Sequence, residues 1–309
     1  MVTGERGPEN RALLAILHTF GARLRLAGSR MMGAMDGREG DDSHQDRALY
    51  LPDGDGFVAT LRTQGGWDPN HQHGGPVQAL LTRAVEHTPT LAPMQIARLT
   101  HDLIRPVPIG PRLRVDVQII REGKRIQLLD AVLRVGDVEH ARLRALRLRV
   151  EDMSGTASIH DTVGRGTDPA WPEELPTDAF GIAEGLPGFL EGMELRRFPR
   201  PGGTEGVHGY WIRIRGPLIA GEVATPLQRL GVAADFTNMI GVTFDARRVS
   251  AINPDLNVHV LREPEGEWIA VVGDSRLALA TGMGVSTAEL RDRGGVCALA
   301  SNCQLIQRR

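Results

Sequence analysis

The chain has 309 residues, of which 41% are hydrophobic and 24% are charged, and its formal net charge at pH 7 is −2. This composition is typical of a folded protein with one large domain or two ordinary ones. The small net charge gives no sign of a nucleic-acid partner and no apolar run approaches the roughly 20 residues of a membrane span, so we expect neither, and we expect a cytoplasmic location.

The two cysteines, Cys297 and Cys303, lie in one expected strand. Their spacing corresponds to about 20 Å along an extended chain. This separation is too large for a disulfide unless the strand bends. Reduced thiols agree with the expected cytoplasmic location.

Residues 1–48 are expected to form an N-terminal extension. A helix is predicted over residues 10–26. The Gly- and Asp-rich run that follows has turn chemistry and no apolar period, which indicates an appended arm.

Residues 49–152 are predicted to form a first folded half. We expect a strand over residues 57–62, a glycine-rich loop that ends at Gly75, and a helix over residues 76–87. Four strands are then expected, over residues 97–105, 113–121, 127–135 and 139–150. Hydrophobic and polar residues alternate in the second and fourth of these strands, which indicates a sheet with one face in water.

Residues 153–204 are rich in Pro, Gly and acidic side chains and are expected to be a linker. Residues 205–309 are predicted to form a second half. Its expected elements are a strand over 209–215, a helix over 226–238 and strands over 256–262, 268–273, 276–281, 287–291 and 296–307. One long helix and an antiparallel set of strands in each half predict an α+β fold, with two sheets that pair side by side.

The two halves share sequence at a fixed offset, which indicates a duplication. The segment LTHDLIR at residues 99–105 recurs as LNVHVLR at residues 256–262, an offset of 157. At the same offset, AVLR at residues 131–134 recurs as AELR at residues 288–291.

The segments that precede these repeats also match, at an offset of 150. Residues 75–85 correspond to residues 225–235, and each segment has proline at its second position. Gly75 or Thr225 comes just before that proline. Because proline suits the first helical position and Gly and Thr suit the position before it, each segment predicts a helix start.

The two predicted helices differ at one position of the buried face. The expected stripe is Val77, Leu80, Leu81, Ala84 and Val85 in the first helix and Leu227, Leu230, Gly231, Ala234 and Asp235 in the second. Burying an unpaired carboxylate is costly, so Asp235 is expected to be paired, protonated or in contact with water in a site. The alternative is that Asp235 is a solvated residue of the last turn or caps a neighbouring backbone.

Five motifs follow one another through the chain. They are GWDPNHQHGGP at residues 66–76, LIRPVP at 103–108, DFTN at 235–238, INPDL at 252–256 and LREPEGEW at 261–268. Together they resemble the double-hotdog thioesterases of the acyl-CoA thioesterase II type, over roughly residues 50–309.

The resemblance implies two hotdog halves in one chain, each a long helix wrapped by an antiparallel sheet. It also implies hydrolysis of acyl-CoA without a metal, a cofactor or a covalent intermediate, and a homo-oligomer, a dimer of double hotdogs. An acyl-thioester-binding protein with weak or no turnover is the alternative. A hydratase of the same fold would need a His/Asp pair in the first half, and His73 with Asp68 fits this poorly.

The resemblance also implies site residues. The family's catalytic aspartate, hydroxyl residue and glutamine fall on Asp235, Asn253 and Cys303, with Gln304 beside Cys303. The amide of Asn253 can still orient a water. Because neighbouring strand residues face opposite sides, Gln304 replaces the missing glutamine only through a bulge or a shift of one residue. Otherwise another residue holds the water, or catalysis is weakened or lost.

Thioester hydrolysis needs a positioned water, a base and donors for the oxyanion. Asp235 is the expected base. Backbone N–H groups at the start of the first helix are expected to face the thioester oxygen, because a helix start carries unpaired donors. Gly74 and Gly75 allow a ligand to approach that backbone, and His73 either orients the substrate or is only structural.

Other patterns carry less information. His71 and His73 have no further ligand at metal-binding spacing, so no metal is expected, and a Gly-x-Ser-x-Gly elbow is absent. A predicted basic face either attracts the phosphates of CoA or is simply solvated. Its members are Arg142, Arg144, Arg147 and Arg149.

Overall fold

The computed structural model describes residues 47–66, 68–156, 169–175, 188–199, 208–240 and 248–308. The predicted helix over residues 10–26 and nearly all of the expected N-terminal extension lie outside the described residues.

The first half contains six strands, one α-helix and a short 3-10 helix among the described residues. These are β1 (Tyr50–Asp53), β2 (Gly56–Ala59), η3 (Leu61–Thr63), α2 (Gly74–Glu86), β3 (Met94–Leu103), β4 (Arg112–Arg121), β5 (Ile126–Val135) and β6 (Val138–Arg149). Later in the chain come η4 (Pro172–Glu174), η5 (Gly188–Gly192), β7 (Met193–Pro199), β8 (His208–Ile214), α3 (Pro226–Ala234), η6 (Asp235–Met239), β9 (Val249–Ile252), β10 (Asp255–Val260), β11 (Ile269–Ala278), β12 (Met283–Asp292) and β13 (Gly295–Arg308).

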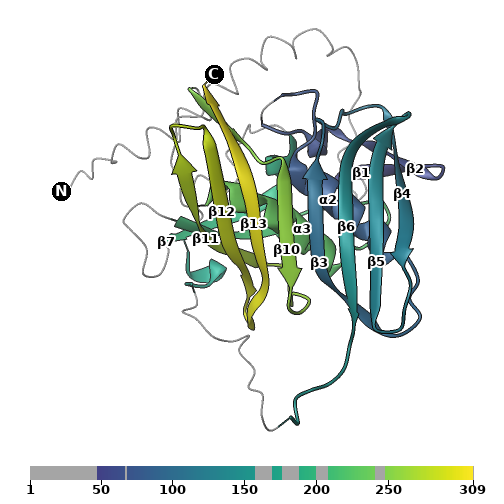
Figure 1. Cartoon of the computed structure of the whole chain (residues 1–309). Coiled ribbons are helices and arrows are strands. Elements are labelled where there is room, and N and C mark those ends of the chain that lie inside the picture. Colours follow the sequence, from purple (N-terminus) through teal and green to yellow (C-terminus); the bar gives the residue numbers. More distant parts are fainter. Residues whose placement is uncertain are drawn as a thin grey trace, which may run out of the picture.

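The strands pair into one continuous antiparallel sheet. Within the described residues this sheet has 13 strands in the order β1-β2-β4-β5-β6-β3-β10-β13-β12-β11-β8-β7, and β9 pairs with β13 off this path. The halves meet at the centre of the sheet, where β3 lies beside β10 (Figure 1). The prediction that two sheets pair side by side is confirmed.

The pairing of β3 with β10 relates the two halves to each other. Thr100 lies opposite Asn257, and these two residues are counterparts at the offset of 157. An approximate twofold relation therefore passes through this pair and exchanges the halves. Each position in one sheet half can be compared with its counterpart in the other.

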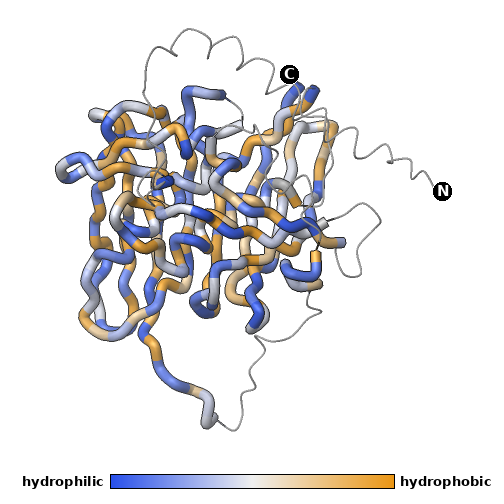
Figure 2. Tube along the Cα trace, turned by 180° about the vertical axis from the view of Figure 1, so that it is seen from behind, coloured by the Kyte–Doolittle hydropathy of each residue, from blue (hydrophilic) through white to orange (hydrophobic). Residues whose placement is uncertain are grey.

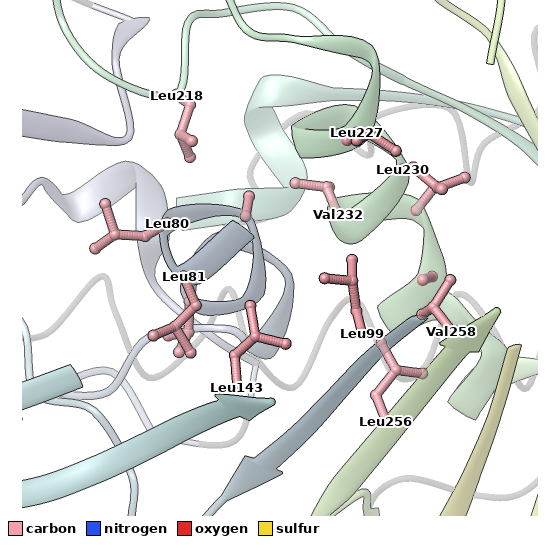
Figure 3. Close-up of a cluster of buried hydrophobic side chains, with 14 of the residues drawn as sticks. Leu80, Leu81, Leu99, Leu143, Leu218, Leu227, Leu230, Val232, Leu256 and Val258 are labelled. Atoms are coloured by element: carbon pink, nitrogen blue, oxygen red, sulfur yellow. The ribbon is translucent and has the colours of Figure 1, made fainter. Parts of the chain in front are cut away.

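Helices α2 and α3 lie side by side against one face of the sheet (Figure 1). They run antiparallel, because Gln78 near the start of α2 meets Asp235 at the end of α3, while Glu86 at the end of α2 accepts hydrogen bonds from Thr225 and Gln228 at the start of α3. Buried leucine and valine side chains from both helices and from the sheet fill the space between them (Figure 3). Each such residue contributes about 1.5–3 kcal/mol.

Hydrophobic and hydrophilic positions alternate along many strands, as a view from behind the sheet shows (Figure 2). In β6, Leu143 and Ala145 are buried, whereas Arg142 and Arg144 lie on the outer face. Each of these two arginines pairs with a carboxylate there, so much of their charge is compensated.

Arg147 does not lie on this outer face, and its predicted grouping with the other arginines is wrong. Its side chain is buried and donates to the side chain of Gln127 and to the carbonyls of Val85 and Thr88 at the end of α2. Successive side chains of a strand point to opposite faces of the sheet. In β6 the odd-numbered positions from Ala141 to Arg147 point toward the helices.

The helix boundaries differ slightly from the prediction. The start of α3 at Pro226 is confirmed, and Thr225 caps it through a capping box with Gln228. Helix α2 instead begins at Gly74, with His73 in the capping position. The last predicted turn of the second helix is the 3-10 helix η6. None of the helices in the described parts of the chain is long and apolar enough to cross a membrane.

Part of the expected linker over residues 153–204 belongs to the sheet. Strand β7 lies within it and pairs with β8, and Phe189 in η5 is fully buried. The predicted strands over residues 268–273 and 276–281 are wrong as two elements, because β11 runs without a break through Asp274 and Ser275. Strands β1 and β9 were not predicted, since each has only four residues.

Candidate active site

Asp235 lies at the junction of α3 and η6, directly beside the start of α2. Asp235 is only 5% exposed, so the alternative that it is a solvated residue of the last helical turn is wrong. Three side chains contact the carboxylate: Gln78 Nε2 and Asn253 Nδ2 each lie 2.9 Å from Oδ1, and His73 Nδ1 lies 2.9 Å from Oδ2. The buried carboxylate is therefore well compensated.

The contact between His73 and Asp235 determines whether His73 Nδ1 donates or accepts a hydrogen bond. His73 Nδ1 also lies 3.2 Å from the backbone nitrogen of Gly75, where it would act as an acceptor. One neutral nitrogen cannot donate and accept at once. Because the contact with a buried carboxylate is shorter and charge-assisted, we assign the proton to Nδ1, which donates to Asp235.

The electrostatics of this cluster keep Asp235 ionised at neutral pH. Burial alone would raise the pKa of the carboxyl group, but the charge and hydrogen bond of His73 and the bonds from Asn253 and Gln78 outweigh burial and hold the pKa below its ordinary value. The N-terminal end of α2 also favours a negative charge nearby.

Gly74 makes this arrangement possible. A Cβ atom at Gly74 would lie 2.8 Å from Oδ1 and 2.9 Å from Oδ2 of Asp235, so any larger residue there would collide with the carboxylate. Gly74 is partly exposed, whereas Gly75 is buried against Phe189 and Val232. Of the two glycines, Gly74 is thus the one that a ligand could approach.

Two residues of the cluster were missed by sequence reasoning. Gln78 lies on the first helix and reaches Asp235 across the boundary between the halves. Phe189, from the expected linker, packs its ring 4.8 Å from the ring of His73, and Phe236 stacks on the same imidazole at 5.7 Å. These aromatic contacts hold His73 in place.

Two family models match the chain in succession. The model described as "Acyl-CoA thioesterase N-terminal domain" matches residues 63–148, and the model described as "Acyl-CoA thioesterase C-terminal domain" matches residues 167–305. The chain belongs to the acyl-CoA thioesterase family. Its two duplicated halves are the two hotdog units of a double hotdog, as predicted.

Solved structures of similar proteins agree with this fold. A protein with a hot dog fold from Alicyclobacillus acidocaldarius is 16% identical, with a TM-score of 0.62, and the match covers 87% of this chain and 99% of that one. An acyl-CoA thioesterase II from Mycobacterium marinum is 15% identical, with a TM-score of 0.59, and the match covers 86% and 98%. A tesB protein from Mycobacterium avium subspecies paratuberculosis is also 15% identical, with a TM-score of 0.59 and coverage of 82% and 92%.

Comparison with curated proteins gives no match. At these identities the solved structures establish the fold alone. The chemistry of this acyl-CoA thioesterase family member has to be argued from its own residues.

The structure places Cys303 and Gln304 on opposite faces of β13. Cys303 is exposed on the outer face, and its backbone N–H donates to Asp255. Gln304 is buried on the helix side, where its Nε2 lies 2.7 Å from Ser286 Oγ and 3.1 Å from the carbonyl oxygen of Asn238. Cys303 is therefore not brought to Asp235, whereas Gln304 lies under the segment that follows Asp235.

Asn302 is a second amide on the helix side of β13, and the sequence prediction did not include it. Its side chain is buried on the helix side, and neither amide atom has a hydrogen-bond partner among the described residues. Because the amide of Gln304 is already bonded, Asn302 is the better candidate for holding a water molecule.

The remaining histidine and cysteine motifs do not form a site in the described residues. His71 contacts Asp68 at 3.3 Å, while His73 contacts Asp235 instead. No group of three or more metal-ligating side chains occurs in the part of the chain that the structure describes. Cys297 is buried away from Cys303, and burial raises its pKa to about 12, so it is a poor nucleophile.

Proposed function

We propose that this protein hydrolyses an acyl-CoA thioester to a free acid and CoA, with Asp235 activating a water molecule. The observation that carries the proposal is the buried carboxylate of Asp235, held by three donors directly beside the start of α2. A carboxylate in this position can accept a proton from water, and the N–H groups at the helix start can stabilise an oxyanion.

The proposed reaction has two steps. The thioester carbonyl lies against the backbone at Gly74, and water attacks its carbon while Asp235 takes one proton from the water. The carbon–sulfur bond then breaks, and the proton passes from Asp235 to the thiolate, which leaves as a thiol. The acid retains the water oxygen, and no covalent enzyme intermediate forms.

The other residues of the cluster have distinct roles in this proposal. Asn253, Gln78 and His73 fix the orientation of the Asp235 carboxylate, and Asn302 holds the water from the sheet side. Three donors make the carboxylate a weaker base, which lowers the rate, but they keep it ionised over the whole neutral range.

The proposal also includes a cytoplasmic location and self-association into a homo-oligomer. Exposed apolar side chains on the outer face of the second half support an interface between copies, because such patches mark contact sites. They are Met283, Val285, Leu299 and Leu305.

The test is Asp235→Asn. Free thiol released from a panel of acyl-CoAs measures turnover, and we expect kcat to fall by about 10²–10⁴, the loss typical of removing a general base. The melting temperature should change little, because the asparagine oxygen can still accept from Gln78 and Asn253, and its amide N–H can donate to His73 Nδ1 once the neutral ring carries its proton on Nε2. Glu86→Gln is the matched control, since Glu86 is the carboxylate at the other end of the helix pair and also contacts a glutamine. This control should retain turnover.

His73→Asn separates orientation from proton transfer. If His73 only orients Asp235, an asparagine donor should retain most of the turnover. A loss as large as that of Asp235→Asn would instead assign proton transfer to His73. Wild-type protein that binds acyl-CoA but releases no thiol would replace the proposal by a binding function without turnover.

A further inference from the structure

A buried histidine on the central strand of the sheet has no role in the mechanism given so far. His101 lies in β3, is 0% exposed, and has no hydrogen-bond partner for either ring nitrogen among the described residues. Its neighbours Thr100 and Asp102 are more exposed, so His101 points toward the helices. Burying two unpaired nitrogens destabilises a fold, which calls for a reason.

His101 is part of a polar row that crosses the sheet. His101 lies opposite Leu256 of β10. On the other side of β10, Asn257 lies opposite Ser301 of β13, and one residue further along both strands Leu256 comes level with Asn302. Asn302 pairs with Ser286 on β12. These residues are buried on the helix side, so three of the four positions carry polar groups under the helices.

The duplication provides a control for this row. The counterparts of the four residues at the offset of 157 form the equivalent row on the other side of the pair Thr100 and Asn257. They are Val258 for His101, Leu99 for Leu256, Ala145 for Asn302 and Leu129 for Ser286. Since the apolar row fills the same place in the same fold, the fold does not require the polar one.

The polar row lies on the side of the molecule that holds Asp235. The negative charge of Asp235 acts on His101. The 3-10 helix η6, which begins at Asp235, reaches the same strands, because Gln304 donates to the carbonyl oxygen of Asn238 and to Ser286. Asp235 itself replaces an apolar counterpart, Val85.

The unpartnered polar atoms of the described residues gather in the same place. Arginine atoms aside, the buried side-chain atoms of the described residues that have no partner belong to η6, which begins at Asp235, to α2, and to strands β3 and β13. They are Gln78 Oε1, both ring nitrogens of His101, Thr237 Oγ1, Asn238 Oδ1 and both amide atoms of Asn302. Donors and acceptors that converge in this way are suited to a bound water.

We propose that His101 and Asn302 together hold the hydrolytic water against Asp235, so that His101 is a further catalytic residue of this enzyme. The inference rests on the proposed thioesterase function. His101 acts as a neutral ring, one nitrogen of which bonds the water while Asp235 takes the proton. Burial lowers the pKa of His101 to about 3 despite the charge of Asp235, which agrees with a neutral ring.

His101→Phe tests the inference, because it keeps a ring and removes both nitrogens. We expect kcat for thiol release to fall 10- to 100-fold with little change in KM, while the melting temperature rises. A purely structural histidine would not show this combination of a lower kcat, an unchanged KM and a higher melting temperature. His101→Asn or His101→Gln should restore part of the turnover, since each returns a polar group to the site.

Val258→Ala is the matched control, since it disturbs the core at the counterpart position. It should lower the melting temperature and leave kcat within about two-fold of wild type. If His101→Phe also leaves kcat unchanged, or if kcat and melting temperature fall together without rescue by Asn or Gln, the inference is wrong.

A crystal structure of the wild-type protein at high resolution separates this inference from the proposed function. An ordered water within hydrogen-bonding distance of a His101 nitrogen and of the Asn302 amide supports the water site, and its absence overturns it. If wild-type protein hydrolyses no acyl-CoA, the proposed function fails, and the crystal structure still decides whether the water site exists.

Discussion

Single residues distinguish the two halves of this molecule far more than their folds do. Asp235, His101 and Asn302 occupy positions that hold Val85, Val258 and Ala145 in the other half. Each polar residue is buried on the same side of the twofold relation. Because a buried polar group destabilises a fold unless it is paired, such differences between matched positions indicate where the chemistry lies.

Comparison of matched positions identifies more of the site than Asp235 alone. The helices contrast Asp235 with Val85, and at the offset of 157 the strands contrast Asn302 with Ala145 and His101 with Val258. The alternation of hydrophobic and polar residues along the strands does not single out Asn302 or His101. Gln78 could not have been found in this way, because its counterpart Gln228 is also glutamine, and only the fold brings it to Asp235.

Gln304 and Asn302 should respond differently to mutation. The counterpart of Gln304 is Arg147, which bonds carbonyls at the end of α2 much as Gln304 bonds the carbonyl of Asn238 beyond α3. Gln304→Ala should therefore destabilise the fold by roughly 1–3 kcal/mol, measured by urea unfolding, because it leaves the carbonyl of Asn238 unpaired and removes one of the two hydrogen bonds of the Ser286 hydroxyl, which keeps its bond to Ser275. Asn302→Ala should instead lower kcat at least ten-fold.

Cys303→Ala serves as the control for both variants. The thiol is exposed on the outer face, so stability and turnover should both stay near the wild-type values. A large loss of turnover in Cys303→Ala, with Asn302→Ala fully active, would instead assign the catalytic position on β13 to Cys303, as the resemblance implies.

At the scale of elements, the start of α2 is the part that the sequence placed least accurately and that matters most for the site. Proline at the first helical position is a strong preference, and it locates α3 correctly. In α2 the helix extends back to Gly74, and His73, with extended backbone, takes the position before the helix while its ring donates to Asp235. Histidine is not among the residues commonly preferred there, so the sequence predicts Gly75 at this position instead.

Gly74→Ala tests how tightly this helix start and the carboxylate fit together. A methyl group there would lie within 3 Å of both oxygens of Asp235, so the carboxylate must shift, and kcat should fall at least ten-fold in the thiol-release assay. Gly231→Ala in α3 is the control, because its methyl group would make only ordinary contacts, at 3.6 Å or more. That change should stabilise the protein by about 0.5–1 kcal/mol and leave turnover unchanged.

At the scale of the whole molecule, the duplication was predictable and determines most of the fold. Matching segments in the two halves predict two similar units. Strands β3 and β10 are equivalent edge strands of these units, so their pairing joins the two sheets at the centre. The position of β7 was not predictable, because the residues around it are rich in Pro, Gly and charge. Its pairing with β8 depends on tertiary contacts such as the packing of Phe198 on Trp211.

The stability of the whole molecule should depend on pH through His101. Its pKa is about 3 in the folded protein, against an ordinary value of 6.5. Between these values the unfolded chain binds a proton that the folded protein excludes, so the free energy of unfolding falls as the pH decreases, by up to about 1.4 kcal/mol per pH unit. The carboxylates with lowered pKa, Asp235 among them, lose their contribution only at lower pH, below about 4.

Comparison of wild type with His101→Phe isolates this contribution. Other titrating groups, such as Glu86, whose pKa is raised by burial, are common to both proteins and cancel in the difference. Between pH 6.5 and pH 5, urea unfolding should show wild type losing about 1.6 kcal/mol more than the variant. Parallel pH profiles would mean that His101 accepts a proton in the folded protein, which contradicts a neutral ring at the water. The same substitution that makes the protein more resistant to acid should make it a slower enzyme, because the two unpaired nitrogens that destabilise the fold are the groups that we propose bind the water.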